Sequence, residues 1–544
     1  MWDLNPAGKI WPLHGPFVAG DVMEERGKEV PGSLGIDVRL IMAGMFLAAL
    51  APLMVTPVLP LIDFYDHLAR FYILAHVGSN ALLQNHYAAH WVVMPDIGTD
   101  ILSTPLLRLV PPLAAAHIIA AVIMAILYSG VLYFHRALTG RHSLLVAALL
   151  LPLLYSYIFN WGFANFLLSL GLAFWAAGWW LSMRHRPRLA VPVACLLSVL
   201  IFLSHGMAFA LYGIMTAMLE IGFFLNRPDR RFIDLVRSLS LLLVQAIIPL
   251  LLFAIWYRHQ APGEMITLSA NLSQEALAEA QPVFRGFHRL STVLRVEEGP
   301  AFWFDAATFI IQLAVIGFLI RRGQATIARP AWLLIGLAAL FILITPAALF
   351  GVWYIVDRMP LFAGLCLLGA LSFSAGPWTP QARAAGGVLA GVVVLRLIAV
   401  TASWQSYAGH YREFTTIAQK IPQGSLTMGV MVGAGHHETE VPRCEMYAPL
   451  LIVQHGQIGP LFAFQGQHPL LLRGALKEAT EKLERAEPVP YAHATDYASY
   501  MTAASDAGFE YLLVCNAHLL KHPVPPDLDV VARTAHFALL RPAH

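Results

Sequence analysis

Residues 112–134 read PLAAAHIIAAVIMAILYSGVLYF, an apolar stretch without Asp, Glu, Lys or Arg. An α-helix needs roughly 20 mostly apolar residues to cross about 30 Å of hydrocarbon, so this stretch predicts a membrane-spanning helix. Similar stretches lie near residues 39–61, 143–159, 161–182, 189–204, 206–225, 238–256, 304–320, 330–351, 360–376 and 384–404. The sequence therefore predicts an α-helical polytopic membrane protein with about 11 spans.

The composition of the whole chain supports this class. Of its 544 residues, 58% are hydrophobic and only 12% are charged, whereas soluble domains carry about 25% charged residues. Four cysteines are too few for a disulfide-rich scaffold. A net charge of +2 gives no basic surface for a polyanion, so nucleic acid is not expected as a partner.

Arginines in alternate short loops predict the orientation of the spans, because cytoplasmic loops carry the excess of Lys and Arg. They are Arg136, Arg141, Arg184, Arg186, Arg188, Arg227, Arg230, Arg231, Arg237, Arg321, Arg322, Arg329 and Arg383. This pattern predicts that residues 1–38 lie in the cytoplasm. They have no apolar run before the first span, so a signal peptide is not expected there. Residues 39–404 form the membrane domain, with outer loops at about 62–110 and 257–303.

The remaining residues, 405–544, are expected on the outer side as a small α/β domain. Apolar runs at 425–432 and 511–514 have the length of strands, and 530–540 could form one last strand. Residues 472–486 have helical spacing with charges interleaved. Cys444 and Cys515 both fall in this domain, where a disulfide is allowed but not required.

The first outer loop opens with residues 59–70, LPLIDFYDHLAR. On a helix, Asp63 and His67 are i,i+4 neighbours, as are Asp66 and Arg70. One interpretation is a carboxylate that acts as a general base, with His67 or Arg70 orienting it or holding an anion. The other is local: Asp63 caps the helix, and Asp66 forms a surface pair with Arg70.

Further along this loop, Asp96 and Asp100 follow a proline and precede a helix, so helix capping is expected of at least one of them. His86 and His90 have an i,i+4 spacing that can chelate a metal, although an amphipathic helix explains the pair as well. Residues 436–440, HHETE, also have metal-binding side chains, but a loop is the simpler explanation.

Polar residues also follow tight turns on the outer side. Asn165 ends the segment 160–165, NWGFAN, and His205 lies between the fifth and sixth spans. Asn at a tight turn and a satisfied histidine at a helix end are the structural alternatives to a substrate-binding role.

Some arginines lie in the predicted outer loops, contrary to the enrichment of Lys and Arg in cytoplasmic loops. Arg258 and Arg358 are therefore candidates for binding a phosphate or diphosphate group. Arg396 falls inside the last span and either pairs with Glu220 or extends to the membrane surface.

This layout resembles the GT-C superfamily of membrane glycosyltransferases. Members have a cytoplasmic N-terminus, a catalytic Asp in the first outer loop, a second long outer loop after span seven and, in many cases, an extracytoplasmic C-terminal domain. The segments Asp63-x-x-x-His67-Leu68-Ala69-Arg70, Pro95-Asp96 with Asp100, and Gly162-Phe163-x-Asn165-Phe166 also resemble a set of bacterial polytopic membrane proteins near GT-C. The chain lacks the Asp-Glu pair and the WWD-type motif of better-known branches.

The resemblance implies a multi-pass protein of the bacterial inner (plasma) membrane, in contact with membrane lipids. It implies a polyprenyl-phosphate sugar donor and a glycan or lipid acceptor in the cell envelope. Asp63 would be the general base, assisted by Asp66 and His67. The substrate-binding residues would be Arg70, Asp96, Asp100, Asn165, His205, Arg258 and Arg358. No cofactor is certain, and a divalent metal stays open.

Two other classes of protein compete with the transferase. A transporter or lipid flippase usually shows internal repeats and broken helices at the bilayer midplane, whereas the polar groups here gather on the outer side. A non-catalytic scaffold for envelope assembly is the third alternative, and it should tolerate Asp63→Asn.

Overall fold

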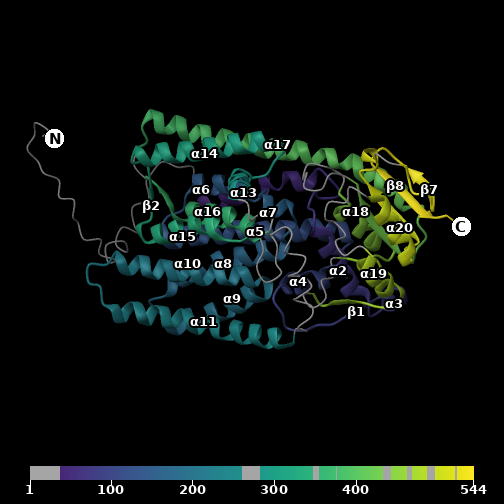
Figure 1. Cartoon of the computed structure of the whole chain (residues 1–544). Coiled ribbons are helices and arrows are strands. Elements are labelled where there is room, and N and C mark those ends of the chain that lie inside the picture. Colours follow the sequence, from purple (N-terminus) through teal and green to yellow (C-terminus); the bar gives the residue numbers. More distant parts are fainter. Residues whose placement is uncertain are drawn as a thin grey trace, which may run out of the picture.

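The computed structural model describes residues 37–259, 282–346, 354–374, 377–432, 443–461, 468–486, 497–520 and 523–543. Its helices form a long bundle, and the C-terminal residues form a smaller domain at one end of that bundle (Figure 1). The fold class is therefore as predicted: a helical membrane domain followed by a small α/β domain.

In chain order, the helices are α1 (Val38–Ala49), η1 (Ala51–Met54), α2 (Phe64–His76), α3 (Ala81–His86), α4 (Gly98–Leu106), α5 (Pro112–Thr139), α6 (Leu144–Leu153), α7 (Tyr157–Asn160), α8 (Ala164–Met183), α9 (Pro187–Ser204), α10 (Gly206–Leu225), α11 (Phe232–His259), α13 (Pro282–Leu294), α14 (Phe302–Arg321), η2 (Arg329–Ala331), α15 (Trp332–Ile344), α16 (Ile355–Ala370), α17 (Pro380–Ala418), α18 (Cys444–Leu450), η3 (Leu451–His455), α19 (Gly474–Ala486), α20 (Tyr497–Ala507) and η4 (Ala517–Leu519). The strands are β1 (Tyr87–Ala89), β2 (Ala325–Ile327), β3 (Leu371–Phe373), β4 (Thr427–Met431), β5 (Leu470–Leu472), β6 (Tyr511–Cys515), β7 (Leu528–Arg533) and β8 (Phe537–Pro542).

Seven helices in the described part of the chain are long and apolar enough to span a membrane: α5, α8, α9, α10, α11, α14 and α17. The shorter apolar helices α1, α6 and α15 fall on three other predicted spans, and α16 falls on the tenth. Leu243, Leu250 and Leu251 on α11 are all more than half exposed. Large apolar side chains exposed along such a helix are explained by contact with lipid.

Three predicted spans differ in extent. The first helix ends at Ala49, because prolines at 52, 57 and 60 interrupt the hydrogen bonding of the stretch that follows. The third ends at Leu153, just after Pro152, and a short separate helix follows it. The last continues to Ala418, so the domain boundary expected at 405 falls inside α17.

The loops that carry the predicted cytoplasmic arginines share one end of the bundle. The connections α5–α6, α8–α9, α10–α11 and α14–α15 lie at the end away from the C-terminal domain (Figure 1). The separation of the two sets of loops therefore agrees with the charge pattern, while the side of the membrane on which each lies stays a prediction.

The C-terminal domain contains a four-stranded sheet with the order β4-β6-β8-β7. β4 and β6 are parallel, and β6 pairs antiparallel with β8. The single strand expected at 530–540 is wrong, because β7 and β8 form an antiparallel pair across a turn at Thr534. The strand expected at 425–432 is β4, and the helix expected at 472–486 is α19.

A second strand pair joins the C-terminal domain to the loop after the first span. β1 pairs antiparallel with β5, with Tyr87 opposite Leu472. The buried Tyr87 hydroxyl also donates to the Gly459 carbonyl oxygen at 2.7 Å. These contacts fix the domain against the loop that carries the candidate residues.

Both expectations for Arg396 are wrong. Its guanidinium is buried and binds Glu297 at 3.0 Å and Asp305 at 3.0 Å, because the chain before α14 returns to the bundle beside α17. Glu220 pairs instead with Arg184 at 3.1 Å. A charge buried in a span is costly unless it is paired, so the two carboxylates explain why Arg396 is tolerated.

We predict that Arg396→Met destabilises the protein by about 3–5 kcal/mol, because it leaves two buried carboxylates without their counter-charge. Arg383→Met is the control, since Arg383 is exposed on the same helix and its loss should cost less than about 0.5 kcal/mol. Thermal unfolding of both variants in detergent measures the difference, and equal shifts would contradict the assignment.

Candidate functional site

The position of Asp63 is set by backbone pairing with a tight turn. The Ile62 N–H donates to the Asn160 carbonyl oxygen and the Asp63 N–H donates to the Trp161 carbonyl oxygen, each at 2.9 Å. Gly162 follows with φ +85°, and a Cβ there would lie 2.4 Å from the Phe64 nitrogen. Only glycine permits this conformation and this close approach.

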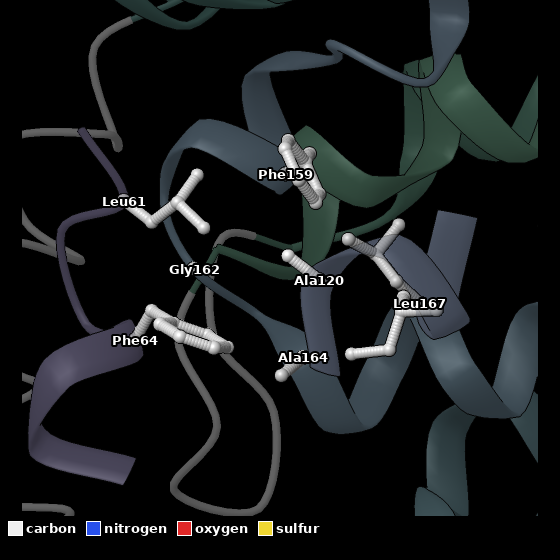
Figure 2. Close-up of a pocket in the computed structure, with 8 residues that line it drawn as sticks. Leu61, Phe64, Ala120, Phe159, Gly162, Ala164 and Leu167 are labelled. Carbon is white, nitrogen blue, oxygen red and sulfur yellow. The ribbon is translucent and has the colours of Figure 1, made fainter. Parts of the chain in front are cut away.

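Beneath this pairing the packing is apolar. Leu61, Phe64, Phe159 and Leu167 surround a small cavity next to Gly162 (Figure 2). Its volume of about 10 Å³ is no more than one water molecule needs. The packing therefore leaves the start of α2 little freedom to shift.

Asp63 is the N-cap residue of α2, but its side chain makes no capping hydrogen bond. It is half-buried at the surface of the site. Burial and the nearby Glu445 carboxylate raise its pKa from 3.8 to about 7, while Arg443 and Arg358 act in the opposite direction. The carboxyl group is thus partly protonated near neutral pH, which suits a general base.

Asp96, His205 and Arg358 meet although they come from three separate segments, and the Arg358 charge also acts on Asp63. His205 Nε2 lies 3.7 Å from Asp96 Oδ1 and 3.3 Å from an Arg358 terminal nitrogen. Burial raises the pKa of Asp96 to about 7, against the effect of Arg358. Asp96 also has φ +71°, a strained backbone conformation of the kind that gathers at functional sites.

The protonation of His205 follows from its partners. Its Nδ1 accepts a hydrogen bond from the Met207 N–H at 3.2 Å, which caps α10. Burial and Arg358 keep the pKa of His205 well below its usual value, so the ring is neutral. The proton of a neutral ring then sits on Nε2, so the 3.3 Å approach of the Arg358 nitrogen to Nε2 is a contact between two donors rather than a hydrogen bond. His205 is therefore both a helix cap and a polar group of the site.

Arg70 has a structural role that differs from the expected pair. It forms a two-pronged ion pair with Asp100, at 2.7 Å and 3.1 Å, and both side chains are buried. The predicted surface pair of Arg70 with Asp66 is therefore wrong, because α4 folds back over α2 and brings Asp100 closer. His67 Nδ1 accepts from the same guanidinium at 2.9 Å.

Asn165 holds the start of α4 in place. Asn165 accepts hydrogen bonds from both the N–H and the hydroxyl of Thr99. Neither Asp96 nor Asp100 is the N-cap residue of α4, which is Ile97. The Asp100 side chain instead accepts from its own backbone N–H in the first turn of α4.

The other candidates lie outside this group or outside the described residues. Asp66 is buried in the first turn of α2. Arg258 is exposed near the end of α11 and makes no ion pair with a described residue. His86 and His90 do not share a helix, because α3 ends at His86. Residues 1–36 and residues 436–440, which have metal-binding side chains, are not among the described residues.

Sequence reasoning missed two site residues in the C-terminal domain, Arg443 and Glu445. Arg443 lies 5.5 Å from the centroid of the Trp161 ring, and both residues affect the charge of Asp63. Their only local signal is that they flank Cys444, whose disulfide with Cys515 is present in the structure.

Several buried polar atoms near Asp63 lack a hydrogen-bond partner among the described residues, as do others elsewhere in the chain. Those of the candidate site are Asp96 Oδ1, Asn160 Oδ1, Trp161 Nε1, Arg358 Nε, Arg443 Nε and Nη1, and Glu445 Oε2. Such atoms are rare in folded proteins, and each calls for an explanation such as a bound ligand. In the described part of the chain, no three His, Cys, Asp or Glu side chains are arranged to hold a metal ion.

Comparison with known proteins found several similar solved structures, including the following two. One is ArnT from Cupriavidus metallidurans bound to undecaprenyl phosphate, with 13% identity, a TM-score of 0.48 and coverage of 92% of this chain and 97% of that chain. The other is the arabinofuranosyltransferase AftD from Mycobacteria, with 14% identity, a TM-score of 0.40 and coverage of 94% and 42%. No family model and no curated protein matches. Similarities at this level do not assign an activity to this chain.

We predict that Gly162→Ala disrupts the site while Gly140→Ala does not. Both glycines have positive φ, +85° and +76°, but a Cβ at position 140 meets nothing within 4 Å. Each variant therefore shares a backbone cost of roughly 1–2 kcal/mol, and only Gly162→Ala also displaces the segment that holds Asp63.

Complementation of a deletion strain, at matched membrane levels of each variant, measures this difference. Gly140→Ala should complement and Gly162→Ala should fail. Equal complementation would show that the pairing beside Gly162 tolerates displacement.

Proposed function

We propose that this chain is a membrane glycosyltransferase of the GT-C type, which moves a sugar from a polyprenyl-phosphate carrier to a hydroxyl of an envelope glycan or lipid. The observation that carries the proposal is Asp63, a carboxyl group with a pKa of about 7 beside the arginines Arg358 and Arg443, each with an unpartnered N–H. This group lies at one end of an apolar helical bundle.

Asp63 supplies the general base of the reaction. Its carboxylate takes the proton of the acceptor hydroxyl as that oxygen forms a bond to the anomeric carbon of the sugar. The bond from that carbon to the phosphate oxygen breaks, and the lipid phosphate leaves with the electron pair. A phosphate is a good leaving group, so no general acid is required, and inversion at the anomeric carbon follows from direct displacement.

Arg358 is the better of the candidates for holding the phosphate. Arg70 is already committed to Asp100, and Arg258 is exposed at the end of α11. The Arg358 guanidinium lies 4.7 Å from the centroid of the Phe163 ring and keeps its Nε without a partner. Guanidinium groups bind phosphate oxygens in a two-pronged geometry and stabilise the charge that develops on the leaving group.

The side of the membrane on which the site lies is inferred from its position in the bundle. The site shares an end of the bundle with the C-terminal domain, away from the arginine-rich loops, which predicts the outer face of the bacterial plasma membrane. The Cys444–Cys515 disulfide is compatible with that side, because disulfides persist in oxidising compartments. The carrier lipid would reach the site from the surrounding bilayer.

We predict that Asp63→Asn reduces transfer by about 10²–10⁴-fold, the usual contribution of a general base. The assay compares a deletion strain that carries wild type or Asp63→Asn at matched membrane levels. Envelope glycans and lipid-linked sugars are measured by mass spectrometry, and loss of one sugar with accumulation of its carrier is expected. Asp529→Asn, an exposed aspartate of the C-terminal domain, is the matched control.

Other results would favour other classes of protein. Full function of Asp63→Asn would favour a non-catalytic scaffold. A variant that changes the membrane leaflet in which the carrier lipid lies, without altering any glycan, would indicate a flippase. Adding EDTA to the purified enzyme tests whether the reaction needs a divalent metal. Loss of transfer that is restored by Mg²⁺ or Mn²⁺ would assign a metal to the reaction.

The pH dependence of the transfer rate should change when the charged neighbours of Asp63 are replaced. Transfer needs the ionised carboxylate, so kcat/KM should rise with pH and level off above about 7, the pKa of Asp63. Arg443→Gln removes a positive charge that favours the carboxylate, so its profile should shift to higher pH. Glu445→Gln removes a negative charge and should shift the profile to lower pH. Shifts in the same direction would exclude this electrostatic arrangement.

A further inference from the structure

The C-terminal domain places the start of α18 beside Asp63. Helix α18 begins at Cys444 and packs against α2, the helix that follows Asp63. Arg443 precedes that cysteine and lies over the Trp161 ring. Because Trp161 also pairs with the Asp63 backbone, two segments far apart in sequence meet at one point.

Arg443 and Glu445 are nearly buried but not satisfied. The Nε and one terminal nitrogen of Arg443, and Oε2 of Glu445, have no hydrogen-bond partner among the described residues. Their closest approach, Arg443 Nε to Glu445 Oε2, is 4.0 Å, beyond hydrogen-bond distance. Arg70 and Asp100, in contrast, form a direct ion pair at 2.7 Å. Leaving buried charged groups without hydrogen bonds is costly, so a group outside the described residues is expected to supply the bonds.

The two groups together suit a hydroxylated ligand. A guanidinium N–H donates to a hydroxyl oxygen, and a carboxylate accepts from a hydroxyl, so neighbouring hydroxyls of a sugar can satisfy both. The carboxylate repels a second phosphate, whereas the opposite charges of the pair make the position suitable for a neutral ligand. Trp161 Nε1, also buried and unpartnered, offers one more donor.

A disulfide holds this pair in place. Cys444, which separates Arg443 from Glu445, is bonded to Cys515 at the end of β6, with a Cα–Cα distance of 5.5 Å. β6 lies in the interior of the four-stranded sheet, and both cysteines are buried. The sheet therefore positions both side chains through one covalent bond.

We propose that Arg443 and Glu445 bind hydroxyl groups of the acceptor glycan or glycolipid, and that the Cys444–Cys515 disulfide positions them beside Asp63. This inference rests on the proposed transferase function, because it assigns the acceptor side of that site. The donor phosphate would lie with Arg358, and the acceptor would lie between Asp63 and the C-terminal domain.

The test separates acceptor binding from donor binding in the full-length enzyme in nanodiscs. The acceptor probe is the envelope lipid and glycan extract of the deletion strain, which contains the unmodified acceptor. Undecaprenyl phosphate, as a product inhibitor, reports on the donor side. Arg443→Gln and Glu445→Gln should each raise the apparent KM for the extract about tenfold or more, as expected for hydrogen bonds to charged groups. The inhibition constant of undecaprenyl phosphate should stay within twofold of wild type.

Arg358→Gln is the reciprocal variant and should weaken inhibition by undecaprenyl phosphate while the apparent KM for the extract stays near wild type. Arg443→Lys retains the charge near Asp63 but not the planar fork, so it should restore the pH profile without restoring the apparent KM. Unchanged apparent KM in Arg443→Gln and Glu445→Gln, or equal loss on the donor side, would overturn the inference alone. Absence of Asp63-dependent transfer in wild type would overturn the proposed function as well.

The disulfide is tested in a Cys195→Ser, Cys366→Ser background, which removes the two free cysteines. Dithiothreitol should then raise the apparent KM for the extract as Arg443→Gln does, with reduction of Cys444 and Cys515 confirmed by alkylation and mass spectrometry. Undecaprenyl phosphate inhibition serves again as the check that the reduced protein stays folded. Reduction without any change in the apparent KM would show that the disulfide does not position the pair.

Discussion

Two backbone hydrogen bonds, from Ile62 and Asp63 to the turn at Asn160 and Trp161, are the constraint on which the site depends. They join the end of the first span to the turn between the third and fourth, and Gly162 lets the two chains approach closely enough. Asp63 gains a fixed position without using its carboxylate for that purpose. The side chain stays available for chemistry because the backbone does the positioning.

The buried charges of this chain fall into two kinds. Arg70 with Asp100, and Arg396 with Glu297 and Asp305, form close ion pairs at 2.7 to 3.0 Å. Such pairs hold segments together, and removing one partner is expensive. Arg358, Arg443 and Glu445 instead keep buried polar atoms without a hydrogen-bond partner among the described residues. A close ion pair, rather than charge itself, distinguishes Arg70 and Arg396 from the proposed substrate-binding residues.

The sequence predicted the spans well and the polar contacts poorly. Apolar stretches such as 112–134 predict a spanning helix without knowledge of the rest of the fold, because a helix in lipid makes all its backbone hydrogen bonds within itself. Span ends were less predictable where prolines interrupt a stretch, as after Ala49, or where a helix continues into the next domain, as α17 does. Helical spacing suggested Asp66 as the partner of Arg70, but such spacing describes neighbours on one helix only. Asp100 arrives from another helix, and nothing in the local pattern indicates it.

By itself, the sequence determined that this chain is a polytopic helical membrane protein with a more polar C-terminal domain, and it singled out Asp63, Asp96, His205 and Arg358. Hydropathy and charge act over short distances along the chain, so these features are readable without a fold. Only the tertiary structure decided that Asp96, His205 and Arg358 meet, that Arg70 pairs with Asp100, and that Arg443 and Glu445 act on Asp63 from almost 400 residues away in sequence. Such contacts depend on how the helices and the C-terminal sheet pack together, and packing is a property of the whole chain.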